Sequence, residues 1–130
     1  GDGMNFFNGF DLEGLRERSE RSQEKEASAV VLDRGVLKVM VLARTTGDRS
    51  CFFIELSIFP GADRGPLDPA MMRRACSLIS ELHSLGYMFY HDGSLIIAER
   101  GTSADDMHGE LSMLWKVISK LEGWPERPSP

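Results

Sequence analysis

The chain has 130 residues and a formal net charge of −5, from 15 basic and 20 acidic side chains. Hydrophobic residues make up 42% and charged residues 27%, which is typical of one globular domain and excludes a disordered, collagen-like or disulfide-rich chain. The acidic balance, with a pI near 5.2, has the wrong sign for binding a phosphate backbone, so we expect no nucleic-acid partner.

The cysteines and the apolar runs predict where the protein resides. Cys51 and Cys76 form no C-x-x-C pair, so we expect reduced, structural thiols and neither a zinc site nor a redox dithiol. No stretch approaches the roughly 18 apolar residues of a membrane span, and the N-terminus has no basic region followed by a long apolar one. We therefore expect a cytoplasmic protein with no membrane partner.

The N-terminal segment is dominated by charge. Ten of the sixteen residues from Asp11 to Glu26 are charged, with both signs interleaved, and only Leu12 and Leu15 are apolar. Because few of these side chains can enter a core, the pattern predicts a weak, solvated helix or a frayed arm. We place residues 1–26 outside the main domain and expect their deletion to lower the melting temperature by only a few degrees.

A cluster of aromatic side chains precedes this segment. Three of the seven Phe residues lie within five positions, at Phe6, Phe7 and Phe10. Such a cluster either packs on its own domain or docks on another chain, and the sequence leaves both interpretations open.

Residues 28–60 are rich in β-branched and aromatic side chains and contain turn residues, which predicts three antiparallel strands. The strands fall at 29–33, 36–44 and 51–60, with a tight turn at Arg34–Gly35 and a looser one over 45–50. We expect the second strand to be central, because it is the longest continuous apolar run. Alternation predicts the core side, which consists of Leu37, Val39, Val41, Ala43, Phe52, Ile54, Leu56 and Ile58.

A helix is predicted to begin at Asp68–Pro69, an N-cap followed by proline at the first helical position. Gly86 is placed to end this helix, with Tyr87 touching Leu82. Asp92–Gly93 then predicts a hairpin. Its two strands fall at 87–91 and 94–100.

A last helix is predicted after Ser103, which with Asp106 resembles a capping box. Gly123 closes the helix, and residues 124–130 form a Pro-rich tail. Residues 27–123 are thus predicted to form a single α+β domain. Its antiparallel sheet of about five strands has helices packed on one face, in the order (α)-β-β-β-α-β-β-α.

No motif assigns a reaction. The glycines near residues 61–65 and at Gly101 lack the spacing of a phosphate-binding loop, the three histidines lack metal-ligand spacing, and no G-x-S-x-G is present. The carboxylates Glu55, Glu81, Glu99 and Glu110 are scattered singly, as is typical of solvated faces. We expect no cofactor, no metal and no catalytic residue.

In element order, length and acidity, residues 11–122 resemble the type III secretion chaperones and the related YbjN-like proteins. The stretch Met107-His108-Gly109-Glu110-Leu111-Ser112-Met113-Leu114 is similar to the last helix of such a family. The resemblance implies α-β-β-β-α-β-β-α subunits that are usually dimeric and bind extended peptides. It transfers no binding residue, because the usual amphipathic first helix is replaced here by the charged segment 11–26.

The first functional hypothesis is a non-enzymatic, chaperone-like module that binds a protein or peptide, with a second copy of the chain as the first candidate. Aromatic side chains rimmed by polar ones are typical of interfaces. Phe53 and Phe59 lie beside Glu55 and Ser57 on the mixed face of the third strand. The predicted interface comprises Phe53, Phe59, Trp115, Phe6, Phe7 and Phe10.

The alternative hypothesis is a small enzyme or ligand-binding domain. Its pocket would lie between the loop at 61–68 and the hairpin at 87–93, where polar side chains would have to converge. The candidate residues of this pocket are Arg64, Tyr87, Tyr90 and His91.

Overall fold

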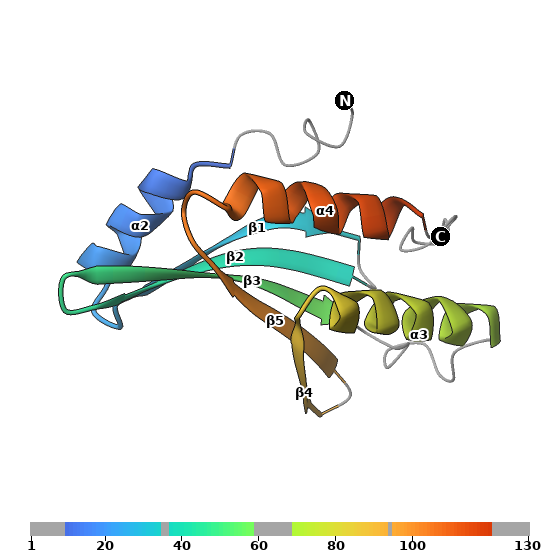
Figure 1. Cartoon of the computed structure of the whole chain (residues 1–130). Helices are drawn as coiled ribbons and strands as arrows, with labels where there is room; N and C mark the ends of the chain where they lie inside the picture. The colour runs from blue at the N-terminus through green and yellow to red at the C-terminus, as the bar shows by residue number, and fades with distance from the viewer. Residues whose placement is uncertain (1–9, 35–36, 59–68, 94, 121–130) are drawn as a thin grey trace.

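The computed structural model describes residues 10–34, 37–58, 69–93 and 95–120 (Figure 1). The helices are α2 (Leu12–Arg21), α3 (Pro69–Ser84) and α4 (Met107–Ser119). The strands are β1 (Glu26–Asp33), β2 (Leu37–Thr46), β3 (Arg49–Ile58), β4 (Met88–Asp92) and β5 (Leu95–Thr102). The element order and the α+β class confirm the prediction. The predicted tail at 124–130 and the closing Gly123 lie outside the described residues.

The strands form one antiparallel sheet in the order β1-β2-β3-β5-β4. The prediction that the second strand is central is therefore wrong, because β3 occupies the middle. The hairpin of β4 and β5 adds through β5 to the free edge of β3, and this long-range pairing leaves β1 and β4 as the edges.

The bounds of all five strands differ from the prediction by one to three residues, and two of these differences have a clear local cause. The turn between β2 and β3 has only two residues, Gly47 and Asp48, and Gly47 has a φ of 64°. A positive φ at the first turn position matches the twist of the flanking strands, so the hairpin is tighter than the predicted loop over 45–50. Strand β1 begins at Glu26, three residues earlier than predicted, directly after Lys25 with a φ of 58°.

The core lies on one face of the sheet, as alternation predicts. All eight residues predicted for the core side of β2 and β3 are buried. They join side chains of all three helices in one cluster, which includes Leu15, Leu78, Leu82, Leu111, Leu114 and Ile118. A bulge between Val30 and Leu32 changes the register of β1 and keeps Leu32 on the core side.

The C-terminal end of α3 follows the predicted signal, whereas the start of α4 differs from the prediction. Gly86 has a φ of 89° and donates its N–H to the His83 carbonyl at 3.0 Å, while the Tyr87 N–H reaches the Leu82 carbonyl at 3.0 Å. These two bonds form a Schellman motif, for which glycine is preferred because it tolerates positive φ. Before α4, the Asp106 N–H donates to Ser103 Oγ at 3.2 Å. The predicted capping box is nevertheless wrong, because α4 begins only at Met107 with Asp106 as its N-cap, and the Asp106 side chain makes no capping bond.

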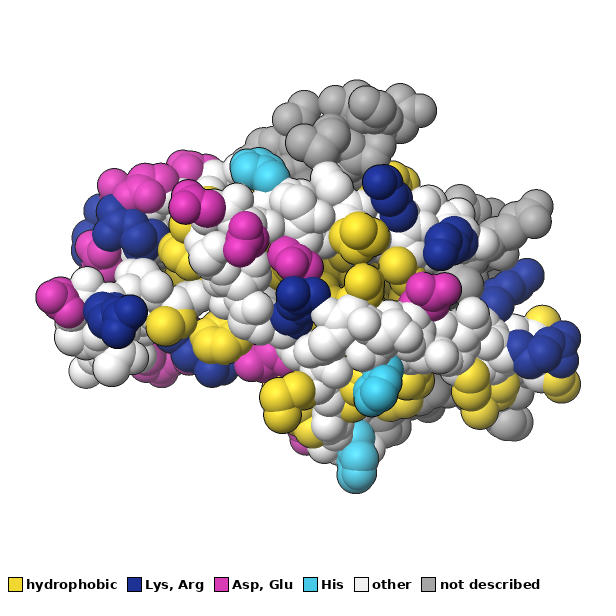
Figure 2. All heavy atoms as spheres, in the orientation of Figure 1, with side chains coloured by type: hydrophobic (Ala, Val, Ile, Leu, Met, Phe, Trp, Pro, Cys, Tyr) yellow, Lys and Arg dark blue, Asp and Glu magenta, His cyan; other side chains and the backbone are white. Residues whose placement is uncertain are grey.

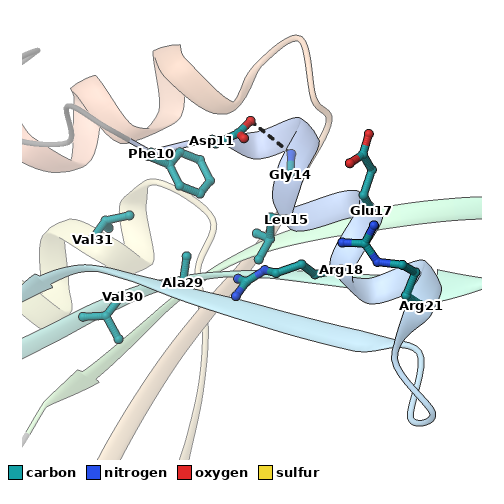
Figure 3. A pocket seen from close by; sticks show the side chains of 10 residues that line it. All are labelled: Phe10, Asp11, Gly14, Leu15, Glu17, Arg18, Arg21, Ala29, Val30 and Val31. Atoms are coloured by element: carbon teal, nitrogen blue, oxygen red, sulfur yellow. Dashed lines mark hydrogen bonds between the residues drawn. The ribbon is translucent and has the colours of Figure 1, made fainter.

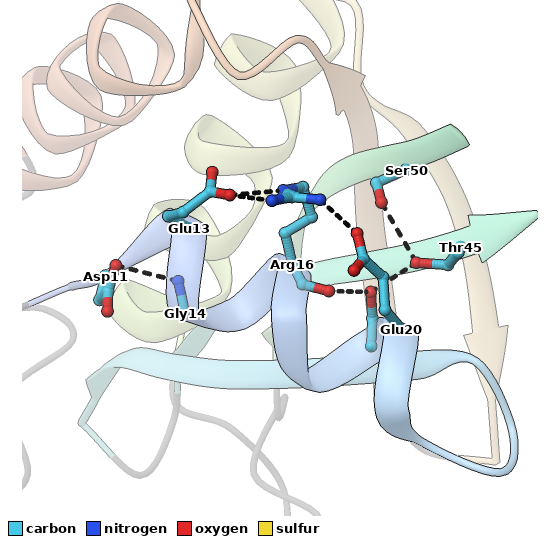
Figure 4. A network of polar contacts seen from close by, with 8 residues as sticks. Asp11, Glu13, Gly14, Arg16, Glu20, Thr45 and Ser50 are labelled. Atoms are coloured by element: carbon cyan, nitrogen blue, oxygen red, sulfur yellow. Dashed lines mark hydrogen bonds and ion pairs between the residues drawn. The ribbon is translucent and has the colours of Figure 1, made fainter. Parts of the chain in front are cut away.

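The prediction of a solvated arm at 11–26 is wrong for one side of α2. Leu15 is only 2% exposed and Ser19 is fully buried. The Ser19 hydroxyl bonds to Thr45 Oγ1 at 2.7 Å, and Thr45 continues to Ser50 Oγ at 3.2 Å (Figure 4). The high density of charges did not predict this packing of α2, because one leucine and one small serine are sufficient to hold the helix against the sheet.

The charged side chains of α2 occupy its outer side. Arg16 forms ion pairs with Glu13 and Glu20, one turn away in each direction (Figure 4). Figure 2 shows acidic and basic side chains gathered at the α2 end of the molecule. Exposed pairs of this kind contribute only a few tenths of a kcal/mol each, so burial of Leu15 and Ser19 holds the helix in place.

Candidate functional site

A groove of about 490 Å³ runs between α2 and the edge strand β1 (Figure 3). Its lining combines apolar side chains with charged ones at the rim. The lining residues are Phe10, Asp11, Gly14, Leu15, Glu17, Arg18, Arg21, Ala29, Val30 and Val31. In Figure 3, Ala29 and Val31 point from β1 towards α2, whereas Val30 points to the opposite face of the sheet. The groove therefore has an apolar floor along a strand edge.

The free edge of β1 presents backbone groups beside this groove. The Thr45 N–H donates to the Lys25 carbonyl at 2.9 Å, and Glu26 pairs with Arg44 in the ladder. Because backbone hydrogen bonds to a neighbouring antiparallel strand are made by every second residue, the N–H and C=O groups of Ala27 and Ala29 bond to β2. The N–H and C=O groups of Glu26, Ser28 and Val30 point away from the sheet.

Arg18 forms a hydrogen bond with one of these outward-pointing backbone groups. Its Nη2 donates to the Ser28 carbonyl at 2.8 Å, and Figure 3 shows the side chain reaching from α2 across to β1. The Asp11 carboxylate caps helix α2, because it accepts a hydrogen bond from the Gly14 N–H at 3.0 Å. The arrangement can bind an extended chain through backbone bonds, with apolar side chains over Phe10 and Val31.

The structure separates the aromatic residues of the predicted interface. Phe10 lines the groove, and Phe6, Phe7 and Phe59 lie outside the described residues. Phe53 is half-buried on the sheet face opposite the core, whereas Trp115 packs from α4 against the core. Phe53 and Trp115 are therefore on different sides of the sheet and do not form one patch.

The alternative pocket is likewise not assembled from the described residues. Arg64 lies outside them. Tyr87 is 3% exposed and belongs to the core, where burial raises the pKa of its hydroxyl. Tyr90 and His91 are both exposed and, as neighbours on β4, point to opposite faces. The small-enzyme hypothesis stays a prediction without a described cavity at this place.

The sheet face opposite the core holds a pair of carboxylates that sequence analysis missed. Glu55 on β3 and Glu99 on β5 are direct cross-strand partners, so the expectation of singly scattered carboxylates is wrong for these two. The Tyr90 hydroxyl is 3.4 Å from Glu99 Oε2. Burial, and then the neighbouring charge of Glu99, raises the pKa of Glu55. Alternation places each residue on this face, but the pairing required the register of β3 with β5.

Replacing Glu55 with glutamine is expected to stabilise the protein at neutral pH, by about 0.2–1 kcal/mol, because it removes a like-charge cross-strand pair. The raised pKa means that the folded state takes up this proton more readily than the unfolded chain. The free energy of unfolding of the wild type therefore rises relative to that of the variant as the pH falls through the pKa of Glu55. Denaturant titrations at neutral and acidic pH measure the difference, with exposed Glu24→Gln as the control. A constant difference across this range contradicts the pairing.

Among the described residues, no cluster of three or more His, Cys, Asp or Glu side chains could hold a metal ion. No helix in the described part of the chain is long and apolar enough to cross a membrane. No family model, curated protein or solved structure matches the chain. The function is therefore inferred from the groove and the sheet.

Proposed function

We propose that the protein is a non-enzymatic binding module that takes up an extended peptide segment in the groove between α2 and β1. The outward N–H groups of Glu26, Ser28 and Val30 and the carbonyls of Glu26 and Val30 carry this proposal, because they offer a ready edge for an added strand. The Ser28 carbonyl is already bonded to Arg18, which a peptide would have to displace at that position. The peptide's alternate side chains would lie over the apolar floor of the groove.

Charge adds little to recognition in this groove. Arg18 and Arg21 are matched by Asp11 and Glu17 in the lining, so neither an acidic nor a basic peptide is favoured overall. Backbone bonds of about 0.5–1.5 kcal/mol each and the burial of apolar side chains supply the affinity. This chemistry tolerates varied sequences, as expected of a chaperone-like module.

The element order agrees with the one on which the resemblance to type III secretion chaperones rests, and peptide binding is the function that the resemblance implies. The family assignment itself stays a proposal. We also propose a cytoplasmic location, since Cys51 and Cys76 are both free and exposed, which fits a reducing compartment.

Val30→Pro is expected to weaken peptide binding by about tenfold or more. The substitution removes an outward N–H without removing a bond to β2, and proline is tolerated on edge strands in this orientation. The probe is a display library of random linear peptides selected on the immobilised wild-type chain. Selected peptides should show alternating apolar residues, and their affinities for each variant are measured by fluorescence anisotropy.

Val30→Thr is the matched control, because it keeps both the N–H and the branched side chain, and it should bind as the wild type does. Amide exchange gives a second readout that does not depend on a variant. Bound peptide should protect the N–H groups of Glu26, Ser28 and Val30. Equal affinity for a folded Val30→Pro variant, or protection confined to other strands, contradicts the proposal.

A further inference from the structure

The sheet face opposite the core is lined by apolar side chains in aligned rows. The central row crosses all five strands through direct cross-strand partners, namely Val30, Met40, Glu55, Glu99 and Met88. With strands about 4.8 Å apart, it spans roughly 19 Å. We call the face defined by this row and its neighbours Leu42, Phe53, Ile97 and Tyr90 the open sheet face.

Several apolar side chains of the open sheet face are exposed, whereas Leu42 and Ile97 are buried, at 6% and 8% exposure. Met88 is 76% exposed, Val30 54% and Tyr90 49%. The described helices contribute their buried residues to the core cluster on the other side of the sheet. Large exposed apolar side chains gathered on one face are typical of a surface that another molecule covers.

The carboxylates of Glu55 and Glu99 lie in the middle of this surface, between Met40 and Met88 in the central row. Neither takes part in any of the ion pairs found between described residues. The nearby cation Arg44 is engaged at the margin, where its guanidinium lies 4.9 Å from the centre of the Phe53 ring and its Nε is 3.6 Å from Glu26. Lys38, half-buried two residues before Met40 on β2, lies on the same face. The two carboxylates therefore form an acidic centre between apolar side chains, with the cations Lys38 and Arg44 at its margins.

A second copy of the chain is a poor occupant for this face. Glu55 lies on the middle strand, so two copies stacked about a twofold axis through the face would bring four carboxylates together. Burying like charges without partners costs several kcal/mol. A cationic side chain at the same place would instead pair with both carboxylates, while apolar groups around it cover Met40, Phe53 and Met88.

We propose that the open sheet face binds a partner protein segment that presents a Lys or Arg side chain in the middle of an apolar surface. The two carboxylates select the cation and the surrounding methionine and aromatic side chains supply the buried area. Methionine suits this role because its flexible thioether adapts to partners of different shape. This surface shares only Val30 with the lining of the α2–β1 groove and does not depend on peptide binding there.

The test uses two capped amphipathic helical peptides that differ only at one central position of the leucine stripe, Arg in one and Glu in the other. A helix is a suitable probe because it is an element that covers a sheet face. At neutral pH, the wild-type chain should bind the Arg peptide about tenfold or more tightly than the Glu peptide. Calorimetric titration measures both affinities.

The double variant Glu55→Gln/Glu99→Gln should lose this preference, and it should fold because glutamine is nearly isosteric with glutamate. The matched control Glu24→Gln/Asp105→Asn removes the same charge from two exposed sites elsewhere and should keep the preference. Peptides selected on the groove should bind the Glu55→Gln/Glu99→Gln variant unchanged, so failure here is separable from failure of the proposed function.

Three results would overturn the inference. The first is equal binding of the Arg and Glu peptides, or no binding of either. The second is an unchanged preference in the Glu55→Gln/Glu99→Gln variant. The third is a dimer at neutral pH, seen by sedimentation at several concentrations, that Phe53→Ser or Met88→Ser dissociates, because a second copy would then cover the face.

Discussion

Replacing Val41 with aspartate is expected to abolish the folded state. Val41 is fully buried on β2, and its ladder partners Ala29 and Ile54 place their side chains on the same core face. An unpaired carboxylate there costs several kcal/mol after relaxation, whereas the total stability of a domain is only about 5–15 kcal/mol. Circular dichroism during heating should show no cooperative transition.

Thr46→Asp is the control, because Thr46 lies at the exposed end of the same strand. It adds the same charge and should melt close to the wild type, since surface substitutions usually change stability by less than about 0.5 kcal/mol. A Val41→Asp variant that melts like Thr46→Asp contradicts the placement of β2 in the interior of the sheet.

Truncating Leu15 to alanine is expected to cost about 2–5 kcal/mol, the usual range for a leucine removed from a core. For a chain of this length, that corresponds to a fall in melting temperature of roughly 10–20 °C. The reason is that Leu15 provides most of the apolar contact between α2 and the strands β1 and β2. Differential scanning calorimetry measures the change.

Leu12→Ala is the matched control, because Leu12 lies in the same helix but is only partly buried. It should destabilise the chain clearly less than Leu15→Ala does. Removal of residues 1–25 should cost at least as much as Leu15→Ala, since it also removes the Ser19 hydroxyl from Thr45. A loss of only a few degrees on this deletion would restore the view of the segment as a solvated arm.

Local patterns predicted the interior strands well. The alternation in β2 and β3 places four core residues on each strand, and all eight are buried. A strand has a period of two residues, so alternate residues share a face, and a slip of one residue would turn the whole apolar set away from the core. Turn chemistry was equally informative at Gly86 and Gly93, where positive φ values of 89° and 63° follow helix α3 and strand β4.

The candidate site was predicted only in fragments. Phe10 and Phe53 were identified as surface candidates, but the sequence grouped them with Trp115, from which the sheet separates Phe53. The groove was missed because its polar members belong to a segment whose charge density obscures its packed side. The carboxylate pair was missed because Glu55 and Glu99 are far apart in sequence and meet only through the pairing of β3 with β5.

The sequence by itself determined the kind and order of the elements and the core face of the sheet, because periodicity, capping and turn residues act between near neighbours along the chain. The tertiary structure alone decided the strand order, the docking of α2 through Leu15 and Ser19, and the two surfaces from which function is inferred. These features depend on contacts between distant segments, and one buried side chain or one register decides each of them. A local pattern cannot show which distant partner a strand or helix will find.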